Sequence, residues 1–154
     1  MIIVETPLAM ASHSGQDLGA TDWLEVTQAE IDAFAALTGD DHWIHVDRER
    51  AGREMPGGRT IAHGLYLLAL IPRLQRGLFR IERRGAGLNY GYDKIRFLAP
   101  VPVGSRLRLR QQVGDVSPRG NGARIALTSV MEIDGASKPA LVADGILLIA
   151  NISP

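Results

Sequence analysis

The 154-residue chain contains no cysteine. This absence excludes disulfide bonds, thiolate metal ligands and a cysteine nucleophile. It is compatible with a reducing compartment, and we therefore expect a cytoplasmic protein.

An excess of positive charge is also lacking, because Lys and Arg total 17 and Asp and Glu total 17. Nucleic-acid-binding proteins usually carry a basic excess, so we expect no nucleic-acid partner. A net charge of zero gives little electrostatic protection against self-association, which favours a homo-oligomer.

Long apolar runs are missing as well. The most apolar stretch, residues 61–72, contains His63 and is shorter than the ~20 residues that a bilayer-spanning helix needs. The N-terminal stretch has no basic segment and is interrupted by Glu5, which argues against a secretory signal. We expect no membrane association.

The length and the 45% hydrophobic content fit a single domain over residues 1–154. Residues 1–20 are rich in Ala, Ser and Gly, with weak periodicity. They are predicted to form a loosely packed N-terminal lead-in.

A helix is predicted over residues 28–38. Thr27 and Glu30 have the spacing of a capping box, in which each side chain bonds the other's backbone N–H. Apolar residues follow at helical spacing. Gly39 is a natural stop because glycine tolerates left-handed dihedral angles.

A loop-rich stretch, residues 39–59, carries a short predicted helix at 47–54. A second helix, apolar on nearly all sides, is predicted to start at Thr60 and to kink or end at Pro72.

The second half of the chain has the alternation and turn residues of strands, at 88–98, from Arg106, at 123–133 and at 140–149. Helices followed by a run of strands predict an α+β fold with an antiparallel sheet. The sheet is expected to wrap around the central apolar helix.

Three segments resemble the MaoC-like (hydratase-2) hotdog family, and in detail its nodulation-protein-N-like branch, which includes (R)-specific enoyl-CoA hydratases. They are residues 34–40 followed by His45, residues 61–65, and residues 89–104. The resemblance implies a hotdog fold, a homodimer whose two sheets form one continuous sheet, and an active site near the dimer interface. It also implies an acyl-CoA or acyl-carrier-protein thioester substrate and no cofactor.

The resemblance assigns the catalytic roles to Asp40, His45 and Gly64. Hydration of a 2-enoyl thioester needs a base for the water, an acid for the α-carbon, and donors for the charge on the thioester oxygen. Asp40 and His45 match the family's Asp-x4-His pair, and which of them is the base remains open. Gly64 matches the glycine whose N–H polarises the thioester carbonyl.

Substrate-binding roles are expected for His63, Ile61, Asn89, Lys94 and Trp43, which lie in or beside the matching segments. His63 is expected to orient the site or to hydrogen-bond the loop rather than take part in the chemistry.

Two departures from the family pattern stand out. His42-Trp43 replaces an Asn-Pro pair between the catalytic residues, so His42 and Asp41 are rival acid/base candidates. Pro72 replaces a serine found in some members, which affects chain preference more than reaction class. The histidines and Asp40 have ligand types that suit zinc, but the family needs no metal and none is expected.

The predicted function is therefore hydration of a trans-2-enoyl-CoA to the (R)-3-hydroxyacyl-CoA, or the reverse dehydration. The alternatives are an acyl-CoA thioesterase and a non-catalytic acyl-thioester-binding hotdog subunit.

Overall fold

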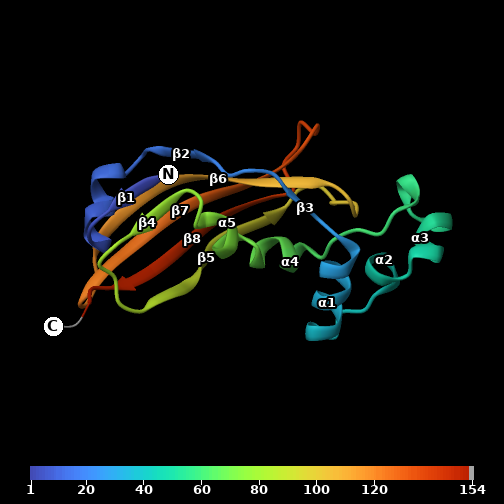
Figure 1. The fold of residues 1–154 in the computed structure, drawn as a ribbon, viewed down its shortest axis with the longest axis horizontal. Coiled ribbons are helices and arrows are strands. Elements are labelled where there is room, and N and C mark those ends of the chain that lie inside the picture. The colour runs from blue at the N-terminus through green and yellow to red at the C-terminus, as the bar shows by residue number, and fades with distance from the viewer. Residues whose placement is uncertain (153–154) are drawn as a thin grey trace.

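The computed structural model describes residues 1–152 and is built on one six-stranded antiparallel sheet (Figure 1). The strand order is β2-β6-β7-β8-β5, and β3 also pairs with β6. The strands are β2 (Asp17–Ala20), β3 (Leu24–Glu25), β5 (Gly87–Phe97), β6 (Arg106–Pro118), β7 (Gly122–Ile133) and β8 (Leu141–Ala150). The predicted α+β class and the four long strands are confirmed.

Two groups of helices lie between β3 and β5 in the chain. The first group, α1, α2 and α3, projects beyond the end of the sheet. In the second group, α4 and α5, helix α5 lies against the sheet itself (Figure 1). The helices are α1 (Gln28–Thr38), α2 (Trp43–Val46), α3 (Arg48–Glu54), α4 (Gly64–Ala69) and α5 (Ile71–Gln75), with a 3₁₀ turn η2 (Pro56–Gly58). None of the helices of residues 1–152 is long and apolar enough to cross a membrane.

Helix α1 has the predicted bounds and caps. The Thr27 side chain accepts from the Glu30 N–H, the Glu30 side chain reaches back, and Gly39 ends the helix with φ 78°. The loop that follows is more ordered than predicted, because residues 43–46 form α2.

The N-terminal segment is not a loose lead-in, contrary to the prediction. Strand β1 (Ile2–Val4) pairs in parallel with β4 (Phe79–Ile81), and the 3₁₀ helix η1 (Pro7–His13) buries Met10 completely. Each short piece buries only one or two side chains, so no periodicity reveals it in the sequence.

The apolar helix differs from the prediction at both ends. Residues before Gly64 are extended, because the Ala62 N–H bonds the Val101 carbonyl and Ile61 bridges Pro102. The helix breaks after Ala69, and Pro72 stands in the first turn of α5. Pro72 lacks an N–H to continue the helical ladder, so the break agrees with the predicted kink.

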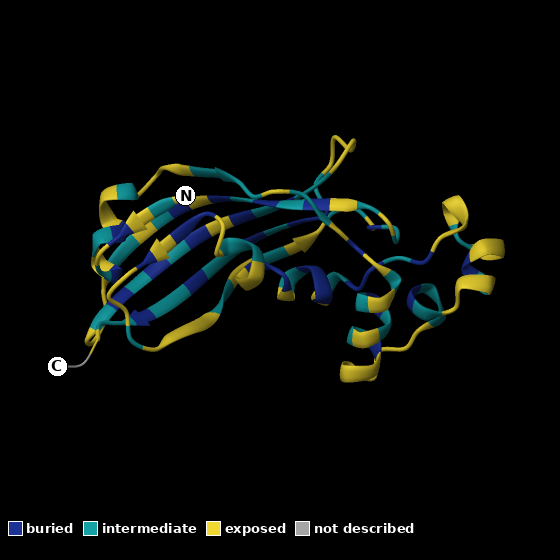
Figure 2. Cartoon of the chain, in the orientation of Figure 1, coloured by how far each residue is buried: buried dark blue, intermediate teal, exposed yellow. Residues whose placement is uncertain are grey.

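The core lies between α4–α5 and the inner face of the sheet, where the central strands are buried (Figure 2). Every second side chain points inward in β7 and in β6 as far as Val113, as the strand period requires. Two of these inward positions are polar, Gln111 and Ser129, and they pair across the strands.

Candidate active site

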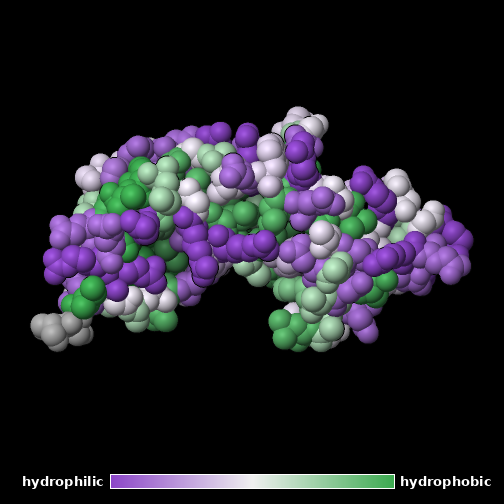
Figure 3. Space-filling model, in the orientation of Figure 1, coloured by the Kyte–Doolittle hydropathy of each residue, from purple (hydrophilic) through white to green (hydrophobic). Residues whose placement is uncertain are grey.

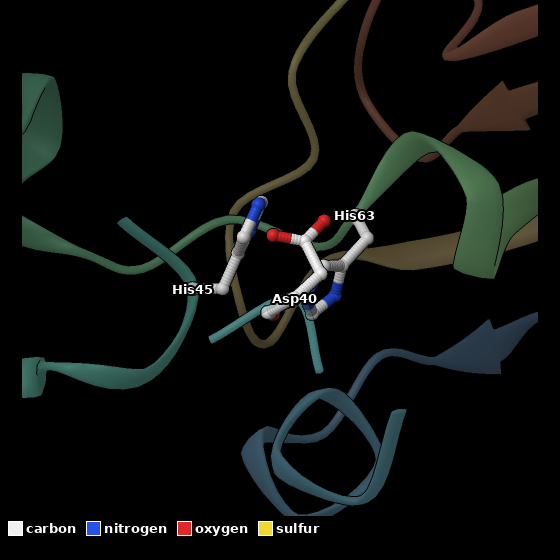
Figure 4. A group of neighbouring side chains, drawn as sticks. All are labelled: Asp40, His45 and His63. Carbon is white, nitrogen blue, oxygen red and sulfur yellow. Dashed lines mark hydrogen bonds between the residues drawn. The ribbon is translucent and has the colours of Figure 1, made fainter. Parts of the chain in front are cut away.

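Three side chains from separate segments converge beside the start of α4 (Figure 4). Asp40 follows the left-handed Gly39 at the end of α1, His45 lies in α2, and His63 precedes α4. One ligand-type atom from each lies within 4.8 Å of the others. The resemblance implied that Asp40 and His45 act together, and the structure brings His63 to the same place.

The hydrogen bonding of His45 fixes the role of each ring nitrogen. Its Nδ1–H donates to the Ile61 carbonyl at 2.7 Å, which leaves Nε2 as the acceptor of the neutral ring. The side chain is buried, and this burial lowers the pKa of His45; the neighbouring His63 acts in the same direction. A neutral imidazole with a free Nε2 lone pair is suited to accept a proton.

His63 contacts both of the other residues. Its Nε2–H donates to the Asp40 carbonyl at 2.8 Å, and its ring stacks on His45 with 3.8 Å between centroids. Phe34 packs on His63 from α1 at 4.9 Å. These contacts link His63 to both the Asp40 loop and the His45 ring, the parts of the site that it is expected to orient.

Gln28 is a positioning residue that the sequence reasoning missed. Its Nε2 donates to the His45 carbonyl at 2.8 Å, and its Oε1 accepts from the buried Thr60 hydroxyl. The capping box at Thr27 fixes the start of α1 and so places Gln28. No local signal distinguishes this residue from any other glutamine in the first turn of a helix.

Gly64 is the first residue of α4, where a backbone N–H has no partner within the helix. Within residues 1–152, this N–H has no hydrogen-bond acceptor. A Cβ atom at this position would lie 2.9 Å from Phe97 Cδ1 of β5. Glycine is therefore required for close packing, which is compatible with a role as donor.

The remaining predicted residues are more scattered. Ile61 holds His45 through its carbonyl, Trp43 lies under the Arg50 guanidinium at 4.1 Å, and Asn89 bonds the Tyr92 hydroxyl. Lys94 is exposed on β5. Within residues 1–152, no hydrogen bond joins the side chains of Trp43, Asn89 or Lys94 to Asp40, His45 or His63.

The rival candidates lie outside the cluster too. His42 caps α2, where its Nδ1 accepts from the Ile44 N–H, and its ring centroid is 6.5 Å from that of His45. Asp41 is exposed and is not among the converging residues.

The three converging residues have ligand types that suit zinc, but their geometry does not fit one ion. The planes of the His45 and His63 rings are only 25° apart, in a stack. A metal ion must lie about 2 Å from each nitrogen, in line with lone pairs that lie in the ring planes. Stacked rings cannot direct two lone pairs at one point, so this arrangement favours proton transfer over metal binding.

Comparisons with known proteins agree with the resemblance. The chain is 44% identical to 3-hydroxyacyl-thioester dehydratase Z of Mycobacterium tuberculosis over 144 residues, 93% of this chain and 95% of the relative. It is 41% identical to nodulation protein N of Rhizobium leguminosarum over 90% of this chain and 87% of that protein.

The fold matches solved structures. R-hydratase PhaJ1 from Pseudomonas aeruginosa superposes with a TM-score of 0.74 at 21% identity, covering 97% of this chain and 93% of that one. This similarity confirms the hotdog fold. The MaoC-like domain matches residues 9–132. The chain therefore belongs to the MaoC-like dehydratase family.

Proposed function

We propose that this protein is an (R)-specific hydratase that adds water to a trans-2-enoyl-CoA and catalyses the reverse dehydration. The observation that carries the proposal is the meeting of Asp40 with the unprotonated Nε2 of a buried His45. The mycobacterial relative, named for dehydration of 3-hydroxyacyl thioesters, supports the reaction class.

The chemistry needs one water molecule held by both side chains. His45 Nε2 takes a proton from the water while the hydroxyl adds to the β-carbon, and the Asp40 carboxylate accepts a hydrogen bond from the second water hydrogen. The imidazolium then gives its proton to the α-carbon on the same face. Water is consumed, the double bond is lost, and His45 returns to its neutral form.

Negative charge builds on the thioester oxygen during this addition. We assign the Gly64 N–H as the donor to that oxygen, because this N–H has no acceptor within residues 1–152. A preorganised donor of this kind stabilises the enolate-like transition state more than the ground state.

Loss of the enoyl-thioester absorbance with crotonyl-CoA tests the proposal. We expect fast hydration by the wild type and a loss of about 10²–10⁴ in kcat/KM for Asp40→Asn and for His45→Gln. Chiral chromatography of the product is expected to give the (R)-3-hydroxyacyl-CoA.

Asp41→Asn and His42→Gln are matched controls that change a neighbouring residue of the same type. They are expected to retain activity. Steady release of free CoA without hydration would instead indicate a thioesterase. A purified wild-type protein that neither hydrates nor hydrolyses would be a binding subunit.

We place this enzyme in the cytoplasm as a homodimer. Within residues 1–152, strand β5 is the outer strand of the sheet, with one side unpaired, and it exposes Leu88, Tyr90 and Phe97. An exposed apolar edge strand is a template for pairing with another chain. Two copies joined along β5 would continue one sheet into the other.

A further inference from the structure

A cavity of about 550 Å³ lies between α5 and the inner face of the sheet. The catalytic candidates do not line it. Its walls are largely apolar side chains from α5, β4, β5 and β8, including Ile71, Phe79, Ile81, Leu88, Ile146 and Leu147. A space of this size and character suits the hydrocarbon part of a small ligand.

The charged residues that line the cavity are all arginines: Arg76, Arg80 and Arg84. Within residues 1–152, no carboxylate lines it. Arg80 pairs with Glu82 at 2.8 Å, whereas Arg76 and Arg84 make no ion pair within residues 1–152. Two exposed guanidinium groups without partners beside an apolar space favour a ligand with an anionic end.

The inner face of the sheet adds a polar contact to this cavity. Gln111 is 1% exposed and stands in a row with Leu107, Leu109 and Val113. Its Nε2 donates to Ser129 Oγ at 2.9 Å and to Gln75 Oε1 at 3.0 Å, while its own Oε1 is buried without a partner.

Burial of an amide with one unsatisfied atom lowers the stability of the fold. The bond with Gln75 gives the buried Gln111 a role in shaping the cavity. It holds the Gln75 carbonyl oxygen toward the sheet, so the Gln75 amide N–H groups remain available as donors in the cavity.

Three elements, α4, α5 and β5, extend from the candidate active site to this cavity. Helices α4 and α5 run from Gly64 to Gln75, and the cavity begins at Ile71, about 10 Å from Gly64 at the helical rise. Strand β5 runs alongside, since Phe97 packs on Gly64 while Leu88 and Asn89 line the cavity. Gly64 and the cavity are therefore joined by the α4–α5 segment and by β5.

We propose that the cavity receives the distal part of the acyl chain, and that Gln75, Arg76 and Arg84 bind a carboxylate at its end. The substrate class is then the 2-enoyl thioester of a dicarboxylic acid. This inference rests on the proposed hydration. A phosphate of coenzyme A is the other anionic group that would suit the same arginines, and the test separates the two sources.

The experiment compares trans-2-octenoyl-CoA and trans-2-dodecenoyl-CoA with counterparts that carry a terminal carboxylate. For the wild type, we expect the carboxylate to raise kcat/KM about tenfold for at least one length, the effect of one charge-assisted hydrogen bond. Arg84→Met and Gln75→Leu are expected to remove this preference. Crotonyl-CoA is too short to reach the cavity, so its hydration should not change.

Arg83→Met is the matched control, because Arg83 is an adjacent exposed arginine that pairs with Glu5 and does not line the cavity. The Arg83→Met protein should keep the preference for the substrates with a terminal carboxylate. The same acyl chains as N-acetylcysteamine thioesters, which lack phosphate, distinguish the anion. If Arg84→Met weakens plain acyl-CoA substrates and leaves the N-acetylcysteamine thioesters unaffected, the arginines bind coenzyme A and the proposal is wrong.

Equal kcat/KM values with and without the carboxylate, alongside normal crotonyl-CoA hydration, would overturn this inference and leave the proposed function intact. If crotonyl-CoA is not hydrated, the proposed function fails separately. Calorimetry with the saturated octanedioyl-CoA and octanoyl-CoA then tests the cavity alone, and equal affinities would overturn the inference.

Discussion

At the residue scale, the environment of His45 predicts how activity depends on pH. Burial lowers the pKa of His45 below its ordinary value of 6.5. The catalytic neutral form is therefore present at pH 7, and kcat/KM should fall on the acid side only below pH 6.5. A pH profile of crotonyl-CoA hydration measures this limb, and a half-maximum above pH 6.5 would contradict the assignment.

Protonation of His45 also changes the stability of the folded protein. Between the unfolded pKa and the lower folded pKa, the unfolded chain binds more protons at this position than the folded one. The contribution of His45 is thus complete above pH 6.5 and declines as the pH falls toward the folded pKa. Urea unfolding at several pH values should show this decline in the wild type and a smaller one in His45→Gln.

His63 gives a second prediction at this scale, because it acts through its neighbours. His63→Phe keeps a ring against His45 but loses the donor to the Asp40 carbonyl. We expect kcat to fall about tenfold or more with little change in KM, since a displaced catalytic group costs rate rather than affinity.

The pH profile separates this positioning role from a merely structural one. The neighbouring His63 contributes to the lowered pKa of His45, so the acid limb of His63→Phe should move to higher pH. An unchanged limb with a uniform loss of folded protein would indicate that His63 only supports packing.

At the scale of elements, the start of α4 depends on the absence of a side chain at position 64. Gly64→Ala would place a Cβ 2.9 Å from the Phe97 ring, which must then move. Overpacking of this kind costs about 1–3 kcal/mol, and the half-exposed ring favours the lower end. Chemical denaturation measures the loss.

Phe97→Leu provides the matched background for this test. If the clash is the cause, Gly64→Ala should cost less stability in the Phe97→Leu protein than in the wild type. Equal costs in the two backgrounds would mean that the glycine is needed for another reason.

The elements themselves were predictable to different degrees. Helix α1 was predicted with its bounds because the capping box and Gly39 are local signals. The apolar helix was predicted too long. Residues 60–63 form backbone hydrogen bonds with the Val101–Val103 segment rather than within a helix, and no local sequence signal indicates these distant partners.

At the scale of the whole molecule, the sheet edge predicts the assembly. Hydrophobic side chains interrupt the polar surface (Figure 3), and Tyr90 on the outer strand β5 is 64% exposed. If two copies join along β5, Tyr90→Lys should shift the protein from dimer to monomer in analytical ultracentrifugation. The like charges would face each other across the edge.

Leu8→Lys is the control, because Leu8 is an exposed apolar residue of η1 and lies away from β5. It should leave the sedimentation coefficient unchanged. A wild type that sediments as a monomer would rule out this assembly.

The sequence by itself determined the features that depend on residues close together in the chain. The capping box, the stop at Gly39, the strand alternation and the five-residue spacing of Asp40 and His45 are all of this kind. Each depends on backbone preference or side-chain period within a turn or two, so it is recorded locally.

Only the tertiary structure decided the contacts between distant segments. The pairing of β1 with β4, the stacking of His63 on His45, and the arginines around the cavity join residues far apart in sequence. Such contacts arise because the sheet and helices bury their apolar faces against one another. The polar groups on these elements then form hydrogen bonds with the groups that the packing brings close to them.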